Sequence, residues 1–306
     1  MEFVYSTLIM VGLYVILASS FDLILGHVGL ISIAHPIFVA LGAYTSALLS
    51  MHFGIPIILS IVLGALFAVI ASIGLALPSL RVSGDYLLIA SIGFQLGILQ
   101  VIKNVDFTGG PSGLSNIPSL IEGAARSLSY LIVVAVAALA VVLVIRWIMK
   151  GDYGRAVIGM RDDEVALNAL GRNSMSIKIT LFALGCGLAG LAGGLYAHYF
   201  LYLSPEQFEI IESAAILTMV VVGGLRSTWG PVIGALLIVA LPQSIRFLDL
   251  PPSINAPLQG IIYTVLVMIF LFVRPQGLVG ARVQLDSRGK QAKGNATAES
   301  TRDKND

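Results

Sequence analysis

Nine apolar runs occupy most of the sequence, and each is close to the roughly 20 residues that a helix needs to cross a bilayer. Only 11% of the residues are charged, whereas soluble domains carry about 25%, so a soluble fold would lack the charge to cover its surface. Lipid removes that need, because helices satisfy their own backbone hydrogen bonds there. We therefore predict an all-α, polytopic transmembrane bundle with about eight or nine spans, including interrupted or re-entrant helices. The apolar runs are residues 4–24, 30–50, 55–78, 86–103, 128–149, 177–200, 209–225, 230–247 and 257–273.

Charged residues concentrate in two stretches, which we expect to lie in water. Of the 35 charged residues, nine fall within 150–178 and eleven within 274–306. Loops rich in Lys and Arg stay in the cytoplasm, so both stretches are predicted to be cytoplasmic, and residues 104–127 are then periplasmic. The N-terminus lies outside if all four early runs span, whereas a re-entrant early helix would reverse it. Residues 1–280 form one predicted transmembrane domain with a cytoplasmic loop at about 150–177, and 281–306 form a disordered cytoplasmic tail.

Several classes of function are excluded by residues that are missing from the sequence. No phosphate-binding Gly-x-x-x-x-Gly-Lys-Ser/Thr segment occurs, so the chain is not expected to hydrolyse ATP. The four histidines are scattered and Cys186 is the single cysteine, so we predict neither a metal site nor a catalytic cluster. A net charge of +1 argues against a nucleic-acid partner. No basic region and cleavage site precede the first apolar run, which we expect to remain as a membrane helix.

The loop between the two middle apolar runs has the pattern of a short amphipathic helix. Asp162 or Asp163 can cap its N-terminus, and Gly171 can end it. Apolar side chains at spacings of three and four residues share one face; they are Val165, Ala166, Ala169 and Leu170. Such a helix suits a groove on another protein, although these residues fit equally well an ordinary linker helix on the membrane surface.

Seven segments, in this order, resemble the LivM-type permeases of the branched-chain amino acid importers. Beside the 161–171 loop they are GHVGLIS (26–32) with GAYT (42–45), LRVSGDY (80–86), TGGPSGL (108–114), GGLYAHY (193–199) followed by SP (204–205), VGGLRSTWGP (222–231) and RPQGL (274–278). The resemblance covers the chain to about residue 280. Asp85 and Ile89 depart from the uncharged, aromatic-rich character of that segment in relatives, which leaves the exact substrate open.

The resemblance implies that the chain is one subunit of an ATP-binding-cassette importer in the bacterial inner membrane. The implied partners are a second permease of the LivH type, two cytoplasmic ATPases that use ATP and Mg²⁺, and a periplasmic substrate-binding protein. The implied solute is a branched-chain or related hydrophobic amino acid, and urea or short amides are alternatives. A self-contained, ion-coupled transporter is the rival, but it needs ionisable residues in the membrane, and the apolar runs contain almost none. The predicted ATPase-coupling residues are Arg161, Asp162, Asp163, Glu164, Ala166, Ala169, Leu170 and Gly171.

Glycine-rich interruptions separate several of the apolar runs. Residues 222–231 place a proline and adjacent glycines between two runs, so they cannot form one continuous helix; a tight turn is predicted with Gly223, Gly224, Gly230 and Pro231. Residues 108–113 present backbone amides that can bind a carboxylate, or they form a plain periplasmic turn. The candidate substrate-pathway residues are Tyr86, Gln95, Asn104, Thr108, Gly109 and Gly110.

Polar residues at membrane depth are functional candidates. Gln95 lies deep in the fourth run and is predicted either to line the pathway or to pack between helices. His35 precedes Pro36 and is expected to satisfy backbone hydrogen bonds that the proline breaks. Glu206, Glu209 and Glu212 are expected to form a solvated acidic rim at the periplasmic side.

Overall fold

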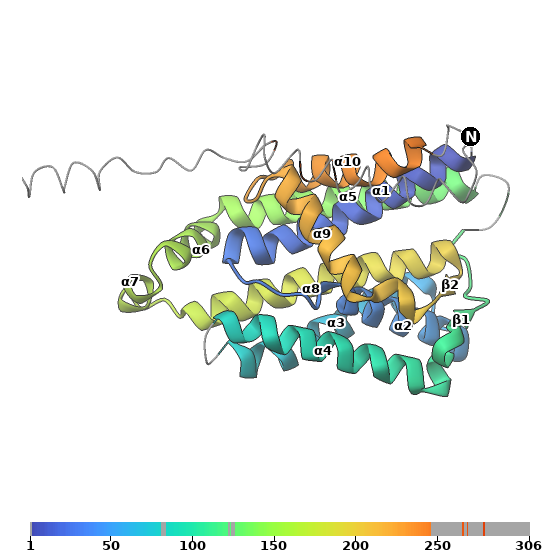
Figure 1. Ribbon diagram of the computed structural model, residues 1–306, viewed down its shortest axis with the longest axis horizontal. Helices are drawn as coiled ribbons and strands as arrows, with labels where there is room; N and C mark the ends of the chain where they lie inside the picture. Colours follow the sequence, from blue (N-terminus) through green and yellow to red (C-terminus); the bar gives the residue numbers. More distant parts are fainter. Residues whose placement is uncertain are drawn as a thin grey trace, which may run out of the picture.

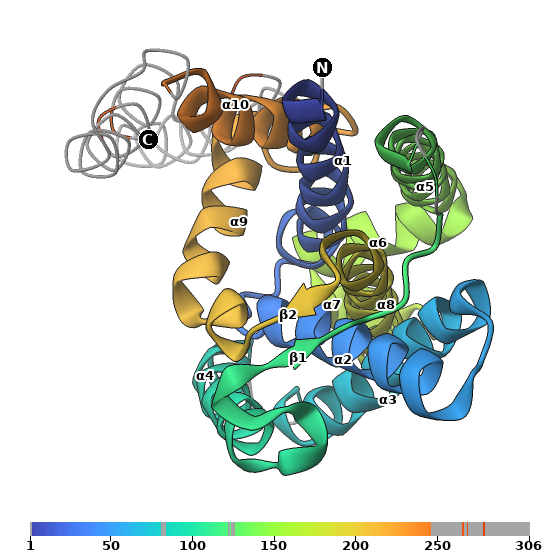
Figure 2. The same ribbon diagram turned by 90° about the vertical axis from the view of Figure 1, so that its right-hand side faces the viewer.

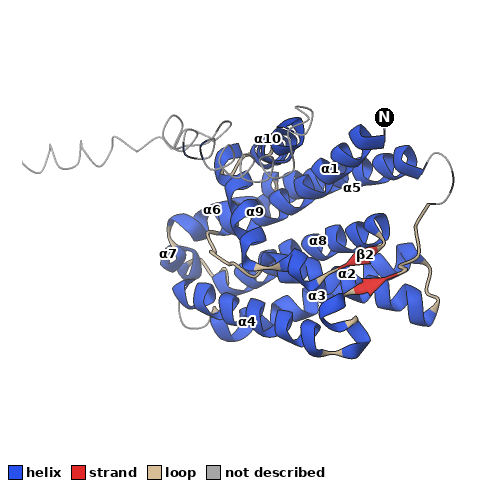
Figure 3. Ribbon diagram, turned by 45° about the vertical axis from the view of Figure 1, so that its right-hand side comes forward, coloured by secondary structure: helices blue, strands red, loops and turns tan. Residues whose placement is uncertain are grey.

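The computed structural model describes residues 2–80, 84–121, 123, 126–245, 265, 268 and 278. Among these residues, six helices are long and apolar enough to cross a membrane, and the first of them continues as a π-helix to Val28. These helices are α1 (Glu2–Asp22), α2 (His35–Phe53), α3 (Ile57–Ser79), α4 (Gly84–Asn104), α5 (Arg126–Lys150) and α8 (Ser174–Phe200). The predicted all-α polytopic fold is confirmed (Figure 3).

The remaining elements are short. The further α-helices are α6 (Asp152–Asp162), α7 (Glu164–Ala169), α9 (Ile210–Gly223) and α10 (Gly230–Ile245). The π-helix η1 (Leu23–Val28) and the 3-10 turns η2 (Asp106–Thr108), η3 (Gly110–Ser112) and η4 (Pro205–Phe208) complete the helical elements. Strands β1 (Leu114–Ser115) and β2 (Tyr202–Leu203) pair antiparallel, with Leu114 opposite Leu203.

The long helices run side by side along one axis, which gives the bundle two distinct ends. Helices α6 and α7 project from one end, and β1 and β2 lie at the other (Figure 1). Helix α8 packs against α1, α2 and α3, and Figure 2 shows it between α1 and α5 on one side and α2 and α3 on the other. Glycine permits this close packing: a Cβ at Gly42 of α2 would lie 2.1 Å from the Gly190 carbonyl oxygen of α8.

Two of the helices begin inside the bundle instead of at its ends. After η1, Gly29 adopts a left-handed conformation (φ 82°), and residues 29–34 run without helix back toward the middle, where α2 begins (Figure 1). Similarly, β2 and η4 separate the end of α8 from α9. The side chain of Gln95, near the midpoint of α4, bonds to the backbone at both starts. The first turns of α2 and α9 therefore lie at mid-depth.

This arrangement corrects the expectation that run 209–225 is a full-length span, and it shifts the start of the span predicted at 30–50 to His35. Residues 30–34 are not helical. Helix α9 has 14 residues, which correspond to about 21 Å at 1.5 Å per residue, less than the roughly 30 Å of a bilayer core. Run 230–247 is described only as far as residue 245. Helix α9 is short because β2 and η4, which precede it, occupy part of the membrane depth without forming an α-helix. The predicted run 257–273, apart from 265 and 268, and the predicted tail 281–306 lie outside the described residues.

Candidate functional site

The α6–α7 segment (residues 152–171) is held at the end of the bundle by a few buried side chains. Helix α6 buries Val157 and Met160, and α7 buries Leu167. At the start of α6, Gly154 lies so close to Met149 that a Cβ would be 2.0 Å from its carbonyl oxygen. The helix predicted at 162–171 is observed as the shorter α7, and α6 precedes it as a separate helix that was not predicted. Each of the two helices has its own apolar anchor.

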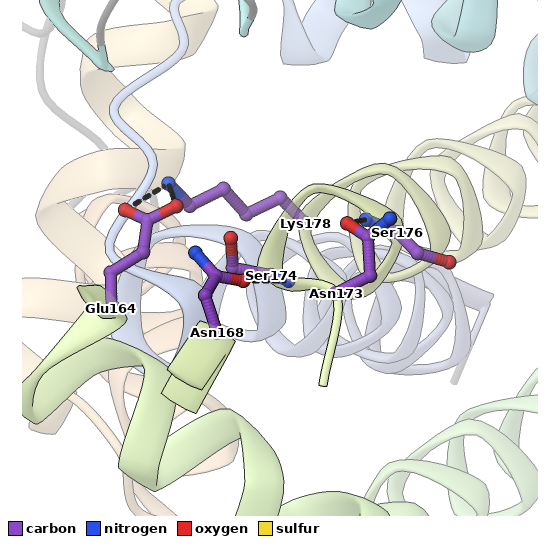
Figure 4. A network of polar contacts seen from close by, with 6 residues as sticks. All are labelled: Glu164, Asn168, Asn173, Ser174, Ser176 and Lys178. Carbon is purple, nitrogen blue, oxygen red and sulfur yellow. Dashed lines mark hydrogen bonds and ion pairs between the residues drawn. The ribbon is translucent and has the colours of Figure 1, made fainter. Parts of the chain in front are cut away.

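Polar contacts fasten α7 to the beginning of α8 (Figure 4). Asp163 caps α7 by accepting the Ala166 amide at 2.9 Å. The ammonium group of Lys178 donates to both carboxylate oxygens of Glu164 at 2.7 Å, and Asn168 accepts the Ser174 amide at 3.0 Å. The hydrogen bonds from Lys178 lower the pKa of Glu164 below its ordinary value. This contribution to stability is therefore present at neutral pH and is lost as the pH falls through the lowered pKa.

The apolar face predicted for this segment is uncovered in the chain alone. Val165 is 79% exposed and Leu170 is 81% exposed, and Ala166 and Ala169 are exposed beside them. Gly171 follows in a left-handed conformation (φ 80°). Exposed apolar side chains on a segment fixed from behind are typical of a protein interface.

Asp22 joins three parts of the chain at this end of the bundle, which the sequence did not indicate. Its side chain is buried, accepts the Arg226 amide at 3.0 Å and lies 3.5 Å from His27 Nδ1. Arg161 of α6 is close enough for its charge to act on the Asp22 carboxylate, and it also lies beside Gly29, where a Cβ would be 3.8 Å from its Nε. The end of α1, the 224–229 turn and α6 therefore converge around one carboxylate.

The 224–229 turn is tight because glycines bring α9 and α10 together. A Cβ at Gly223 would lie 1.9 Å from the Gly230 carbonyl oxygen, and one at Gly230 would lie 2.2 Å from the Gly224 oxygen. Pro231 is in the first turn of α10, where its missing amide costs no helical hydrogen bond. All four predicted turn residues thus lie at this contact.

Side chains from two helices, α4 and α9, satisfy the backbone of the non-helical segment 29–34 and of the α2 start. The Ile33 amide donates to Ser91 at 3.0 Å, and the Ile33 carbonyl accepts from Ser213. Gln95, fully buried, accepts the Ile37 amide at 3.2 Å and donates to the Phe208 carbonyl at 2.6 Å. We call Ser91, Gln95 and Ser213 the polar seam. Such partners are needed because an unsatisfied backbone group costs several kcal/mol in lipid.

The other predicted pathway residues are not brought together with Gln95. Tyr86 is 55% exposed on α4, and Asn104 caps the far end of that helix by bonding to the Gln100 carbonyl. The amides of Thr108, Gly109 and Gly110 already donate to the carbonyls of Val105 and Asp106. This usage favours the plain-turn interpretation of residues 108–113 over the carboxylate-binding one.

Two expectations for ionisable residues are wrong. Helix α2 begins at His35, so Pro36 breaks no hydrogen bond there, and the His35 ring instead bonds to Ser20 at 2.9 Å. The three glutamates do not form one solvated rim: Glu209 pairs with Lys103 at 3.1 Å, whereas Glu212 faces an internal cavity and accepts a hydrogen bond from Tyr14. The two glutamates have different surroundings because α9 begins at mid-depth, with Glu209 just before the helix and Glu212 in its first turn.

The bundle consists of long apolar helices, two of its helices begin at mid-depth, and the α6–α7 segment is uncovered at one end. These features define a helical membrane transporter of the interrupted-helix kind. The family described as branched-chain amino acid transport system / permease component matches residues 3–271. The chain belongs to this family. Within the described residues, no group of three or more His, Cys, Asp or Glu side chains could hold a metal ion.

Similar proteins with assigned functions are also permeases of branched-chain amino acid transport systems. The chain is 34% identical to the high-affinity branched-chain amino acid transport system permease protein LivM of Salmonella typhimurium, over 93% of this chain and 72% of the relative. It is 34% identical to LivM of Escherichia coli (92% and 71%), and 24% identical to the permease protein LivH of Salmonella typhimurium (87% and 91%). No solved structure matches the chain.

Proposed function

We propose that this chain is one permease subunit of an ATP-driven importer that carries branched-chain or related hydrophobic amino acids across the bacterial inner membrane. The observation that carries the proposal is the uncovered apolar face of α7, on a helix tied to α8 by Lys178 and Asn168. The assigned transport of branched-chain amino acids by the LivM relatives supports the solute class.

The proposed complex contains a second permease of the LivH type, two cytoplasmic ATPases and a periplasmic substrate-binding protein. The similarity to LivH supports a partner of related fold. The ATPase subunits bind ATP and Mg²⁺, and this chain binds no cofactor of its own. The α6–α7 segment faces the cytoplasm, in keeping with its Lys and Arg residues, and the β1–β2 end receives the binding protein.

Coupling proceeds from the ATPases through α7 into α8. Closure of the ATPase dimer moves α7, with contacts from the predicted coupling residues 161–164, 166 and 169–171. Because Glu164 and Asn168 bind the first turns of α8, that motion passes into the helix at the centre of the bundle. Rocking of the helices then exposes the solute alternately to the two sides. The solute passes near the polar seam, so among the predicted pathway residues Gln95 is closest to the pathway.

ATP dependence tests this proposal directly. We expect the reconstituted complex of both permeases, ATPases and binding protein to accumulate radiolabelled leucine in proteoliposomes only with ATP. Urea and short amides, added as competitors, are expected not to reduce uptake. Leucine uptake by this chain alone, driven by an ion gradient without the ATPases, would show that it is a secondary transporter and would refute the proposal.

A charge exchange tests the link between α7 and α8. Glu164→Lys places two cations together and removes an ion pair worth roughly 0.2–1 kcal/mol, so we expect a slightly lower Tm and a severalfold loss of ATP-driven uptake. The double variant Glu164→Lys, Lys178→Glu restores the pair with its direction reversed, and both properties should return. If the double variant stays as impaired as the single one, Glu164 acts by contacting the ATPase and the link is not the cause.

A further inference from the structure

A cavity of about 220 Å³ lies between α1, α2, α8, η4 and α9. Most of its wall is aliphatic, with Leu13, Val39 and Ile216 among the lining residues. The wall includes Pro36 in the first turn of α2 and Glu212 in the first turn of α9. The cavity therefore lies where the two broken helices begin, at mid-depth of the bundle.

One carboxylate faces this apolar cavity. Glu212 is half-buried and its Oε2 accepts a hydrogen bond from the Tyr14 hydroxyl at 3.2 Å. The ion pairs found among the described residues do not include Glu212, whereas the neighbouring Glu209 is paired with Lys103. A carboxylate at membrane depth is costly without a cationic partner, so its position calls for a function.

Two hydrogen-bond donors share the same wall. Gln207 uses its Oε1 to accept the Ser204 amide at 3.2 Å, which leaves its amide nitrogen as a donor. Tyr196 also lines the cavity. Neither the Gln207 nitrogen nor the Tyr196 hydroxyl has a hydrogen-bond partner within the described part of the chain. The wall thus combines an acceptor for a cation, donors for an anion and an aliphatic surface.

We infer that this cavity is a binding subsite for an aliphatic α-amino acid, with Glu212 receiving the ammonium group of the solute. Tyr196 and Gln207 are placed to donate to its carboxylate, and the aliphatic wall receives its side chain. An apolar cavity of about 150 Å³ holds benzene, so the larger volume here suits valine or leucine. The inference rests on the proposed function, since it assumes that such amino acids are the solute.

Isosteric removal of the charge tests this subsite. In the complete complex in proteoliposomes, Glu212→Gln keeps the shape of the side chain but loses the charge-assisted hydrogen bond to ammonium, and we expect the KM for leucine uptake to rise by about tenfold or more. Tyr14→Phe removes only the hydroxyl that orients Glu212 and should raise KM severalfold. Glu209→Gln, which changes a glutamate outside the cavity, is the matched control and should leave KM unchanged.

The wild-type complex separates failure of the subsite from failure of the proposed function. If the wild-type complex shows no ATP-dependent leucine uptake, the proposed function itself fails. If it transports leucine and Glu212→Gln has the same KM as Glu209→Gln, the subsite is overturned while the proposed function stands.

A labelling experiment decides the matter if Glu212→Gln does not assemble. Cys186 is the single native cysteine and is fully buried. In a Cys186→Ala background an introduced cysteine is therefore the one thiol of the chain, and it can be labelled selectively. We expect leucine, added with the binding protein, to slow methanethiosulfonate labelling of Met10→Cys, at a half-buried side chain that lines the cavity, severalfold. Ile211→Cys, at a side chain that is 76% exposed outside the cavity, should react at the same rate with and without leucine. Equal rates at Met10→Cys as well would overturn the subsite.

Discussion

Leu170→Asp is expected to lower ATP-driven leucine uptake by about a hundredfold, the equivalent of about 2.7 kcal/mol in ATPase affinity. Leu170 is 81% exposed at the end of α7, and Val165 is 79% exposed on the same short helix. An apolar side chain that becomes buried at an interface is typical of a binding hot spot, and a carboxylate in its place would be buried without a partner. Because Leu170 contributes little to the chain's own core, the variant should fold normally.

Copurification of the ATPases with the tagged permease pair measures this effect directly. Asp152→Asn, in the same segment but outside the predicted coupling face, is the matched control, because Asp152 is exposed and pairs only with Arg155 within the described residues. It should retain both ATPase binding and uptake. Normal uptake and normal ATPase copurification in Leu170→Asp would contradict an interface at α7.

Gln95→Leu is expected to give the largest loss of stability among single changes in the bundle. The substitution leaves the Phe208 carbonyl without its donor and the Ile37 amide with only its bond to Ala34. A buried backbone group without a partner costs about 1–3 kcal/mol, and the starts of α2 and α9 also lose their common link. We expect a lower Tm in detergent and strongly reduced uptake, because both broken helices border the cavity.

The same substitution five residues further along α4 supplies the control for Gln95→Leu. Gln100 is exposed on the same helix, so Gln100→Leu should leave Tm and uptake close to wild type. An equal Tm for the two variants would show that Gln95 does not hold the broken helices in place. A lower Tm with normal uptake would show that the seam has only a stabilising role.

The α6–α7 segment shows how much of the candidate site local sequence could predict. Capping and helical spacing depend on residues within one or two turns, and so Asp163, the exposed face and Gly171 were all indicated in advance. Lys178 was missed as the partner of Glu164, because a contact across 14 residues depends on how two helices meet. The burial of Leu167 was missed for the same reason, since four of the six residues of α7 are apolar and their spacing alone does not say which of them faces the bundle.

The broken helices could be predicted only in part. Glycine-rich segments at 108–113 and 222–231 indicated interruptions between apolar runs, but the breaks before α2 and α9, and the depth at which these helices begin, were not predicted. The acidic residues near 206–212 were predicted to share one solvated rim because they are close in sequence and near the predicted periplasmic side. Their different environments depend on α4 and α1, which supply Lys103 and Tyr14.

The sequence by itself determined that this chain crosses a membrane as helices, because scarce charge and apolar runs of bilayer length leave no other low-energy solution. It also determined the uncovered face of α7 and the family. Only the tertiary structure decided that Gln95 joins two helix starts, that α9 is too short to span, and that Glu212 faces a cavity. The physical reason is that lipid requires partners for broken backbone at depth, and those partners come from helices distant in sequence.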